Sequence, residues 1–434
     1  MSDAAFIFIL VGSVGLSVGL RFCPTRWRAD ASAVAGAMFI VFSCGLRDAF
    51  HPLLAIGLAI ICLKIMPERL HSLAAFTLAF GHLAVLRMSS SPPEGPTNAA
   101  LLILVLRLAG ADGAVAAGSG SGRNSSVELA RFALCYHGLF TGPYYSHVSW
   151  EQMMRSPKPW PSARHCGAKL LAVLAALAVW RGTAAALPYE ALWDGTATDW
   201  PGWQRYAYFF GAGFPFRWRF YACWLLMELS GDILGSSGSS NVDLIAVELA
   251  TCPTAIIAGW NTSVQAWLKA NVYHGLQQRS TPRPARRLAV FAVSAFWHGI
   301  RPGYYLFFLG LFAMVSVEQV VRATTPEPWF EAAAPNDTTM ARGRRGVVAI
   351  VCHVWTLGCF GFFGGAFNLL RWSDTVRLWR SVDFYGVWLT PIPAACAVFQ
   401  LLMPTMRIGM SGNAARERSQ GRLGVERDAK LKSS

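Results

Sequence analysis

The sequence predicts an all-α protein: a polytopic bundle of about ten or eleven transmembrane helices with short interfacial helices between them. Three observations predict this class. Hydrophobic residues make up 54% of the 434 residues and charged residues only 14%, against about 25% charged residues in an ordinary soluble domain. The hydrophobic residues come in blocks that approach the roughly 20 residues a helix needs to cross a bilayer. Short stretches rich in glycine, proline and arginine separate these blocks.

The first quarter of the chain contains five apolar segments. Residues 4–20 lack a basic leader and follow Asp3, so we expect a retained membrane anchor and not a cleaved signal peptide. The Ser/Pro-rich residues 89–96 break the helical pattern. Arg107 lies in the fifth segment, and we expect it to reach the membrane interface because polar sequence follows within a turn. The other expected segments are 31–45, 53–66, 71–88 and 98–109.

The middle of the chain alternates apolar segments with polar stretches. Residues 150–165 and 188–205 are polar and tryptophan-rich, as is typical of segments at the headgroup level. Glu228 lies in the aromatic segment 216–229, where it is either the partner of a cation or, as we favour, an exposed residue near the helix end. Further helical or apolar segments are expected at 127–140, 170–180, 206–215 and 242–259.

The last third begins with an amphipathic segment, 261–276. Five apolar residues recur there at the spacing of one helical stripe, namely Trp260, Val264, Trp267, Leu268 and Val272. Membrane spans are then expected at 306–321, 347–370 and 384–403, with an interfacial helix at 371–383. Residues 1–403 are expected to form a single transmembrane domain, and the basic residues 404–434 a disordered tail.

The net charge of +14 is concentrated in short loops and in the tail. Our main expectation is that these arginines and lysines mark cytoplasmic loops. Binding of anionic lipid headgroups or of a coenzyme A phosphate stays open. No recognised nucleic-acid module accompanies the charge, so nucleic acid is not an expected partner. The ten cysteines form no Cys-x-x-Cys pair, so neither a disulfide framework nor a metal site is expected.

One histidine interrupts the apolar pattern. Residues 296–308, Phe-Trp-His-Gly-Ile-Arg-Pro-Gly-Tyr-Tyr-Leu-Phe-Phe, join two apolar runs. An ionisable side chain inside a membrane segment is costly and by default marks a functional site. Gly299, Pro302 and Gly303 can break a helix, and non-helical backbone at membrane depth is stable only where protein or a cavity surrounds it. The alternative is a histidine that only hydrogen-bonds between helices.

Two motifs in this half of the chain carry a family resemblance. The pattern Trp-His-Gly-x-x-x-Gly-Tyr-x-x-x-Phe is complete from Trp297 to Phe308, and residues 260–268 read Trp-Asn-Thr-Ser-Val-Gln-Ala-Trp-Leu. They resemble the histidine and asparagine motifs of the membrane-bound O-acyltransferase family, in its lysophospholipid acyltransferase branch. Shorter resemblances at 141–145 and 219–224 are most similar to the branch member that acylates lysophosphatidylinositol.

The resemblance implies a tunnel in the membrane where acyl-CoA, as co-substrate, meets a lysophospholipid during phospholipid remodelling. It implies His298 and Asn261 as catalytic residues, and no permanently bound cofactor is expected. The chain's C-terminus, Lys430-Leu431-Lys432-Ser433-Ser434, resembles a dilysine retrieval signal of endoplasmic-reticulum membrane proteins. Positions that the motifs assign to substrate binding are Trp260, Trp297, Gly299, Arg301, Gly303, Tyr304 and Phe308.

The residues themselves permit a direct acyl transfer. No Gly-x-Ser-x-Gly nucleophile elbow occurs, so an acyl-enzyme is not expected. His298 is the candidate general base, because imidazole has an unperturbed pKa of about 6.5 and burial favours its neutral form. Asn261 can donate to the thioester carbonyl oxygen or orient the hydroxyl, and its alternative role is an ordinary helix N-cap. Since 298 − 261 = 37 positions separate the two, folding must bring them together.

Other functions stay open at this point. The acceptor is either a lysolipid with another headgroup or a protein or peptide, as elsewhere in the superfamily. A polytopic transporter predicts broken helices at paired positions of two halves, and the sequence has no such symmetry. A scaffold protein leaves the two matched motifs without a reason.

Overall fold

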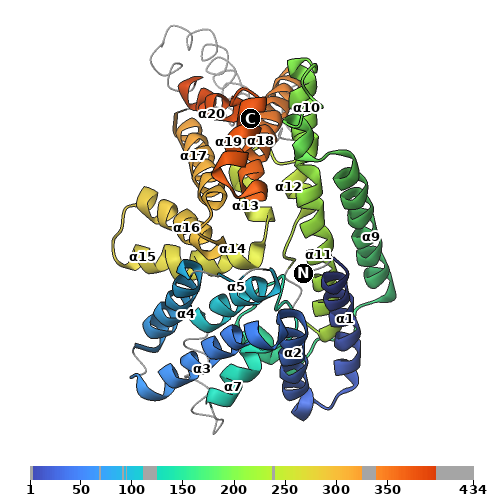
Figure 1. The fold of residues 1–434 in the computed structure, drawn as a ribbon, viewed down its shortest axis with the longest axis vertical. Helices are drawn as coiled ribbons and strands as arrows, with labels where there is room; N and C mark the ends of the chain where they lie inside the picture. Colours follow the sequence, from blue (N-terminus) through green and yellow to red (C-terminus); the bar gives the residue numbers. More distant parts are fainter. Residues whose placement is uncertain are drawn as a thin grey trace, which may run out of the picture.

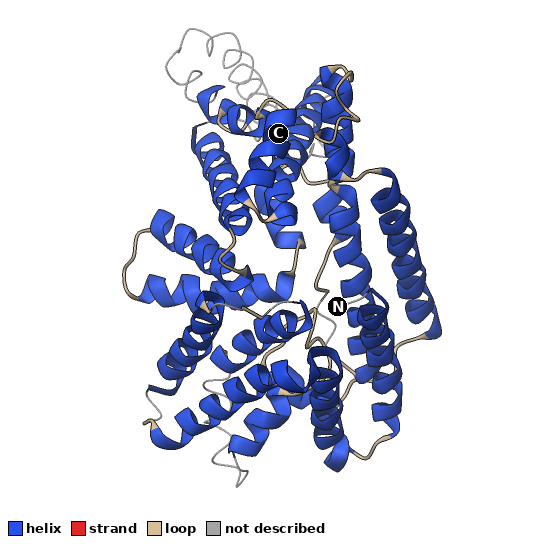
Figure 2. Cartoon of the chain, viewed as in Figure 1, coloured by secondary structure: helices blue, strands red, loops and turns tan. Residues whose placement is uncertain are grey.

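The computed structural model describes residues 3–67, 70–89, 92–93, 95–110, 125–236, 240–324 and 339–396. Within these ranges the chain forms helices and loops and no β-strand (Figure 2). The predicted all-α class is therefore confirmed. A single isolated antiparallel bridge in the described ranges joins Val242 to Trp260. The predicted tail, 404–434, lies outside the described residues.

The N-terminal half builds one end of the molecule and a long flank beside it, and its last helix reaches the other end (Figure 1). Its helices are α1 (Asp3–Phe22), α2 (Thr25–Asp48), α3 (Phe50–Ile65), α4 (His71–Met88), α5 (Gly95–Ala109), α7 (Ser125–Ala133), α8 (His147–Arg155), α9 (Ala163–Ala186), the 3₁₀ turn Tyr189–Leu192, and α10 (Gly202–Ala212). The C-terminal half continues with α11 (Phe214–Leu234), which packs along α9 and α1.

Short helices follow at the middle of the molecule, and longer ones build its other end (Figure 1). The short ones are α12 (Leu244–Glu248), α13 (Pro253–Gly259), α14 (Thr262–Leu268), the π-helical turn Lys269–Tyr273, and α15 (His274–Gln278). Of the remaining helices, α16 (Arg283–His298) also lies at the middle, and the other end holds α17 (Pro302–Thr324), α18 (Thr339–Leu369), α19 (Trp372–Ser381) and the short α20 (Tyr385–Leu389).

Local sequence determines where several of these helices begin. The side chains of Ser146 and Ser162 each accept a hydrogen bond, 3.2 Å long, from the backbone N–H three residues later, at the starts of α8 and α9. Asp243 does the same for α12 at 2.9 Å. Such side chains satisfy N–H groups that have no partner within the helix. At its other end α11 stops at Gly235, whose φ of 92° favours glycine.

Buried apolar side chains form two large clusters. The first comes from α1 to α8, together with residues of α14 and Trp297. The second comes from α9, α10, α11, α17, α18 and α19. α16 contributes to both, with Ala295 in the second cluster and Trp297 in the first. The two clusters therefore meet at the middle of the molecule, where α13, α14 and α16 lie (Figure 1).

Four helical segments in the described ranges are long and apolar enough to cross a bilayer, judged by length and composition: 25–48, 163–192, 302–324 and 346–369. Shorter apolar helices lie in α1, α3, α4 and α5. The number of ten or eleven spans stays a prediction. The expected final span, 384–403, begins as α20, and its residues from 397 onward lie outside the described part.

Arg107 does not reach the membrane interface, contrary to expectation. Its side chain is fully buried and donates hydrogen bonds to the carbonyl oxygens of Ala133 (3.0 Å), Cys135 (2.7 Å) and His137, and to the Tyr145 hydroxyl (2.7 Å). The helix expected over 127–140 ends at Ala133, and the carbonyl groups that follow it need donors. A guanidinium offers five, so Arg107 stabilises the non-helical chain after α7.

Glu228 is also buried, at 5% exposure, so the expectation of an exposed residue is wrong. The alternative partner for a cation is confirmed, because Lys169 of α9 lies 3.0 Å from its carboxylate. α11 continues to Leu234, beyond the expected end at 229, which places Glu228 inside the helix and against α9.

Candidate active site

A cavity of about 370 Å³ lies where the two apolar clusters meet. Leu102 of α5, which packs against the first cluster, and Phe308 of α17, which belongs to the second, both line it. Its volume falls in the range of about 300–1,000 Å³ that small-molecule sites occupy. His298 and Asn261 both lie on the wall of this cavity.

His298 is the last residue of α16. The Gly299 N–H donates to the Ala295 carbonyl at 3.0 Å, and the chain then turns into α17, which begins at Pro302. This turn leaves the imidazole half-buried, facing the cavity. Among the described residues neither ring nitrogen of His298 has a hydrogen-bond partner, so both are available to a substrate.

Aromatic rings surround the imidazole and fix its plane. Tyr304 and Phe308 stack on it, with ring centroids at 5.7 and 5.4 Å and interplanar angles of 27° and 25°. Phe367 of α18 meets it edge-on at 4.8 Å. These contacts leave the ring little freedom to rotate. A fixed imidazole in an apolar wall is a suitable acceptor for one proton, because the surroundings hold its orientation without using its nitrogens.

Asn261 precedes α14 and has a left-handed backbone, with φ of 48° and ψ of 53°. Its carbonyl oxygen accepts from the N–H groups of Val264 and Gln265, each at 3.1 Å. Its side chain caps nothing, and its buried Oδ1 has no hydrogen-bond partner within the described chain. Asn261 therefore occupies the N-cap position of α14, as the alternative expected, but its side chain does not make the capping hydrogen bond. The carboxamide remains available to a molecule in the cavity.

α5 holds both motifs in place. The Trp297 indole, beside His298, donates to the Leu102 carbonyl at 2.8 Å, and the Trp267 indole of the asparagine motif donates to the Leu106 carbonyl at 3.0 Å. These carbonyls lie one turn apart on the same helix. Two sequence stretches that are distant in the chain thereby share one support.

The structure places four of the seven expected substrate-binding residues on the cavity wall: Trp260, Trp297, Tyr304 and Phe308. Trp260 packs edge-on against Trp224 and Phe220 of α11, with centroids at 4.9 and 5.9 Å. Gly299, Arg301 and Gly303 are not part of the wall. Arg301 is exposed at the turn between α16 and α17.

The two glycines have packing roles that explain the residue type. A Cβ atom on Gly303 would lie 2.1 Å from the Ala366 carbonyl oxygen of α18, and the Gly303 N–H donates to the Leu370 carbonyl at 2.9 Å. A Cβ atom on Gly299 would lie 2.6 Å from the Tyr304 ring. Gly303 thus permits the close approach of α17 and α18, and Gly299 permits the close approach of the Tyr304 ring.

Sequence reasoning missed polar residues that also line the cavity. Ser294 precedes His298 by four positions on α16, and Gln265 follows Asn261 by four positions on α14. Because residues four apart share a helix face, their spacing from the predicted pair was a usable signal. Asn98 of α5 lines the cavity too, and no comparable pattern pointed to it.

α11 contributes two arginines to the wall, Arg217 and Arg219. The buried Arg217 forms two hydrogen bonds with the Glu248 carboxylate, 2.8 and 3.1 Å long, and the Tyr221 hydroxyl donates to the same carboxylate at 2.7 Å. Arg219 lies with its guanidinium carbon 5.5 Å from the centre of the Trp180 ring. The charge of Arg217 is therefore balanced inside the protein.

The two shorter stretches of family resemblance meet at the same wall. The Trp224 indole of α11 donates to the Thr141 carbonyl at 2.9 Å, and both residues line the cavity. All four stretches singled out in the sequence therefore converge on one site.

Comparison with known proteins identifies the family. The sequence model of the membrane-bound O-acyltransferase family matches residues 94–362, which include the four stretches on the cavity wall. The chain belongs to the membrane-bound O-acyltransferase family. The predicted family resemblance is thereby confirmed, and the protein is a membrane-integrated O-acyltransferase.

Of three relatives of this O-acyltransferase, two align with it over most of its length and one over less than half. Lysophospholipid acyltransferase 1 of Arabidopsis thaliana is 25% identical over 449 residues, covering 92% of this chain and 94% of the relative. Membrane-bound acylglycerophosphatidylinositol O-acyltransferase of Bos taurus is 24% identical over 461 residues, covering 88% of this chain and 91% of the relative. Lysophospholipid acyltransferase of Saccharomyces cerevisiae is 30% identical over 200 residues, covering 42% of this chain and 31% of the relative.

Proposed function

We propose that this O-acyltransferase transfers a fatty acyl chain from acyl-CoA to the free hydroxyl of a lysophospholipid, with lysophosphatidylinositol as the acceptor. The observation that carries the proposal is the presence of His298 and Asn261 on the wall of one cavity, at the meeting point of two apolar clusters. The names of relatives that align over about nine-tenths of the chain support a lysophospholipid acceptor, and one of them supports the inositol headgroup.

The first step is the attack of the acceptor hydroxyl on the thioester. A ring nitrogen of His298 takes the hydroxyl proton as the oxygen forms its bond to the thioester carbon. The tetrahedral intermediate then collapses, the carbon–sulfur bond breaks, and the imidazolium returns the proton to the departing thiolate. The products are a phospholipid ester and free coenzyme A, and the enzyme ends in its starting protonation state.

Asn261 stabilises the negative charge that develops on the thioester oxygen. The reacting hydroxyl has a single proton, and His298 receives it. The asparagine is therefore most useful as a donor, through Nδ2, to the carbonyl oxygen.

The wall of the cavity suits an amphipathic acceptor with a phosphate. Phe307, Phe308 and Phe367 give it apolar surface for an acyl chain. Arg219 lies on the wall, and we expect its guanidinium to meet a lipid phosphate there. We place the reaction in the endoplasmic-reticulum membrane on the basis of the dilysine-like C-terminus. Replacing Lys430 and Lys432 by serine should move a tagged protein out of the endoplasmic-reticulum membrane. If the tagged protein stays in that membrane, this assignment is wrong.

The test is product analysis with competing acceptors. Membranes that contain the protein are incubated with one acyl-CoA, an equimolar mixture of lysolipids with different headgroups, and a peptide with a free hydroxyl. We expect acylated lysophosphatidylinositol to dominate the mass spectrum, and His298→Ala membranes to give none above background. Preferred acylation of another lysolipid would overturn the headgroup, and acylation of the peptide alone would overturn the substrate class.

A further inference from the structure

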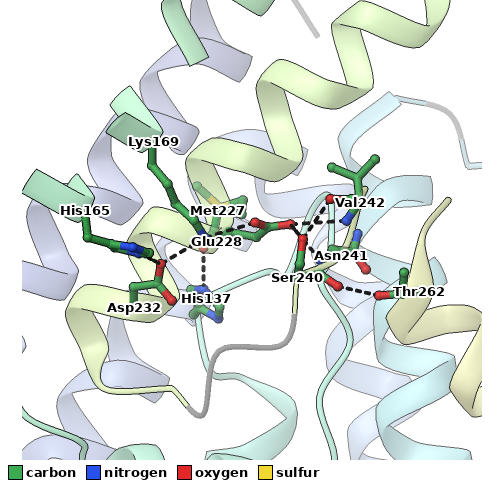
Figure 3. Close-up of polar contacts among 10 residues, drawn as sticks. All are labelled: His137, His165, Lys169, Met227, Glu228, Asp232, Ser240, Asn241, Val242 and Thr262. Atoms are coloured by element: carbon green, nitrogen blue, oxygen red, sulfur yellow. Dashed lines mark hydrogen bonds and ion pairs between the residues drawn. The ribbon is translucent and has the colours of Figure 1, made fainter. Parts of the chain in front are cut away.

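A chain of polar contacts runs from α9 and α11 to Thr262, the residue that follows Asn261 in the sequence (Figure 3). It starts at Lys169, whose ammonium lies 3.0 Å from the Glu228 carboxylate and 2.9 Å from that of Asp232. His165 contacts Asp232 at 2.8 Å. The side chains of Glu228 and Asp232 are only 3% and 14% exposed. A buried carboxylate is costly unless it is paired and hydrogen-bonded, and Lys169 supplies the pairing.

The other contacts of Glu228 reach the segment 240–242. One carboxylate oxygen, Oε1, accepts from the backbone N–H groups of Asn241 (2.6 Å) and Val242 (3.2 Å) and from the Ser240 hydroxyl (3.1 Å). Lys169 contacts the second oxygen, Oε2. Glu228 thus anchors three consecutive residues to α11, and charge-assisted bonds of this kind are about twice as strong as neutral ones.

The segment 240–242 in turn holds the residues that follow Asn261. The carbonyl oxygens of Ser240 and Asn241 accept from the Thr262 hydroxyl (2.6 Å) and the Thr262 N–H (3.0 Å). The Asn241 Oδ1 accepts from the N–H (3.2 Å) and the hydroxyl (2.6 Å) of Ser263. Asn241 is fully buried, so these bonds have no competition from water at its side chain.

The same segment holds the residues that precede Asn261. Val242 forms the isolated bridge with Trp260, and the Asp243 N–H donates to the Gly259 carbonyl at 2.8 Å. Within the described ranges the Asn261 side chain makes no capping bond and its Oδ1 has no hydrogen-bond partner, and its backbone occupies the left-handed region. Its direction is therefore determined by the residues on either side, and both sides are bound to the segment that Glu228 anchors.

We propose that Glu228 is a positioning residue, which aims the Asn261 carboxamide into the cavity through the segment 240–242. The inference rests on the proposed catalytic role of Asn261. Glu228 is not among the residues that line the cavity, so it acts on the reaction only through the backbone it holds. A displacement of about 1 Å in a catalytic group can cost roughly a hundredfold in rate, so the anchor should affect kcat and leave acceptor binding almost unchanged.

Glu128 provides a matched control. It is a buried carboxylate that pairs with Arg131 (2.9 Å) and Arg155 (2.7 Å) on α7 and α8, and among the described residues these pairs do not connect it to the segment 240–242. The purified variants Glu228→Ala, Glu228→Gln, Glu128→Ala and Glu128→Gln are compared for kcat, for the acceptor KM, and for hydrogen exchange of backbone amides. Loss of a buried ion pair should lower the stability of the Glu228 variants and of the Glu128 variants alike. Displacement of Asn261 should occur only in the Glu228 variants.

We expect Glu228→Ala to lower kcat by roughly a hundredfold and Glu228→Gln by about tenfold, because glutamine keeps the accepting oxygen but not the charge. The acceptor KM should change less than about threefold. Hydrogen exchange should accelerate at residues 241, 242, 262 and 263 in the Glu228 variants only. If Glu228→Ala does not fold, kcat and the hydrogen exchange of these four amides in Glu228→Gln test the inference.

Equal kcat in the Glu228 and Glu128 variants, or unchanged exchange at these four amides, would overturn the inference. An Asn261→Ala protein is measured alongside. Full activity of Asn261→Ala would instead refute the proposed role of Asn261 itself, so the two failures are distinguishable.

Discussion

Trp267 and Trp297 donate indole hydrogen bonds to carbonyl oxygens that lie one turn apart on α5. One belongs to the asparagine motif and the other to the histidine motif. The helix that accepts both bonds also lines the cavity through Leu102. The relative position of the two motifs therefore depends on α5, which carries neither of them.

Replacing Trp297 by phenylalanine should preserve most of the buried ring while removing the bond to Leu102. The loss of one neutral hydrogen bond should lower the free energy of unfolding by about 1 kcal/mol, and the freed end of α16 should lower kcat several-fold. Thermal denaturation in detergent and initial rates measure the two effects. An unchanged kcat would show that α5 does not position His298.

Replacing Asn261 by aspartate separates its two possible contributions. A carboxylate cannot donate a hydrogen bond, and its charge would oppose the developing oxyanion. Asn261→Asp should therefore be at least as slow as Asn261→Ala, each with a loss of about 10²–10³ in kcat. Single-turnover rates measure this. An aspartate variant much faster than the alanine variant would mean that the oxygen atom orients the hydroxyl instead.

Replacing Gly303 by alanine should separate α17 from α18, because the new methyl group would overlap the Ala366 carbonyl. We expect a loss of about 1–3 kcal/mol in unfolding free energy and lower activity, since Phe308 moves with α17. Gly358→Ala on α18 is the control, because its Cβ would meet open space. Equal stability of the two variants would contradict the close packing of these helices.

Replacing Arg219 by glutamine should weaken binding of the phosphorylated acceptor. A hydrogen bond to a charged group is worth about 1.5–3 kcal/mol, so the acceptor KM should rise by roughly ten- to a hundredfold while kcat changes little. Arg181→Gln is the matched control, because Arg181 also lies against the Trp180 ring, at 5.8 Å, but does not line the cavity. The same KM in both variants would exclude a role for Arg219 in binding the acceptor.

The features that could be predicted from the sequence are those encoded locally. A long apolar run is sufficient to predict α17 and α18, because hydropathy depends only on neighbouring residues. The catalytic candidates His298 and Asn261 were found because each stands inside a short motif. The structure adds that both line one cavity, which no local pattern contains.

The features that could not be predicted depend on backbone groups that are distant in the chain. Arg107 is buried because carbonyl oxygens more than 25 positions away need donors. Glu228 is buried because Lys169 and the backbone of Asn241 approach it from other elements. A carbonyl or N–H group is present at nearly every residue, so contacts to it leave no trace in residue type. The polar sequence that follows Arg107 and the expected helix end near Glu228 therefore suggested exposure.

The most direct test of the account is the acyl-transfer rate of purified His298→Ala with acyl-CoA and lysophosphatidylinositol. Its folded state is checked by gel filtration and thermal denaturation. We predict a normally folded protein whose kcat is lower by about 10²–10⁴-fold, which is the usual contribution of a general base. A folded His298→Ala protein that retains the unmodified enzyme's rate would contradict the assignment of this histidine as the base.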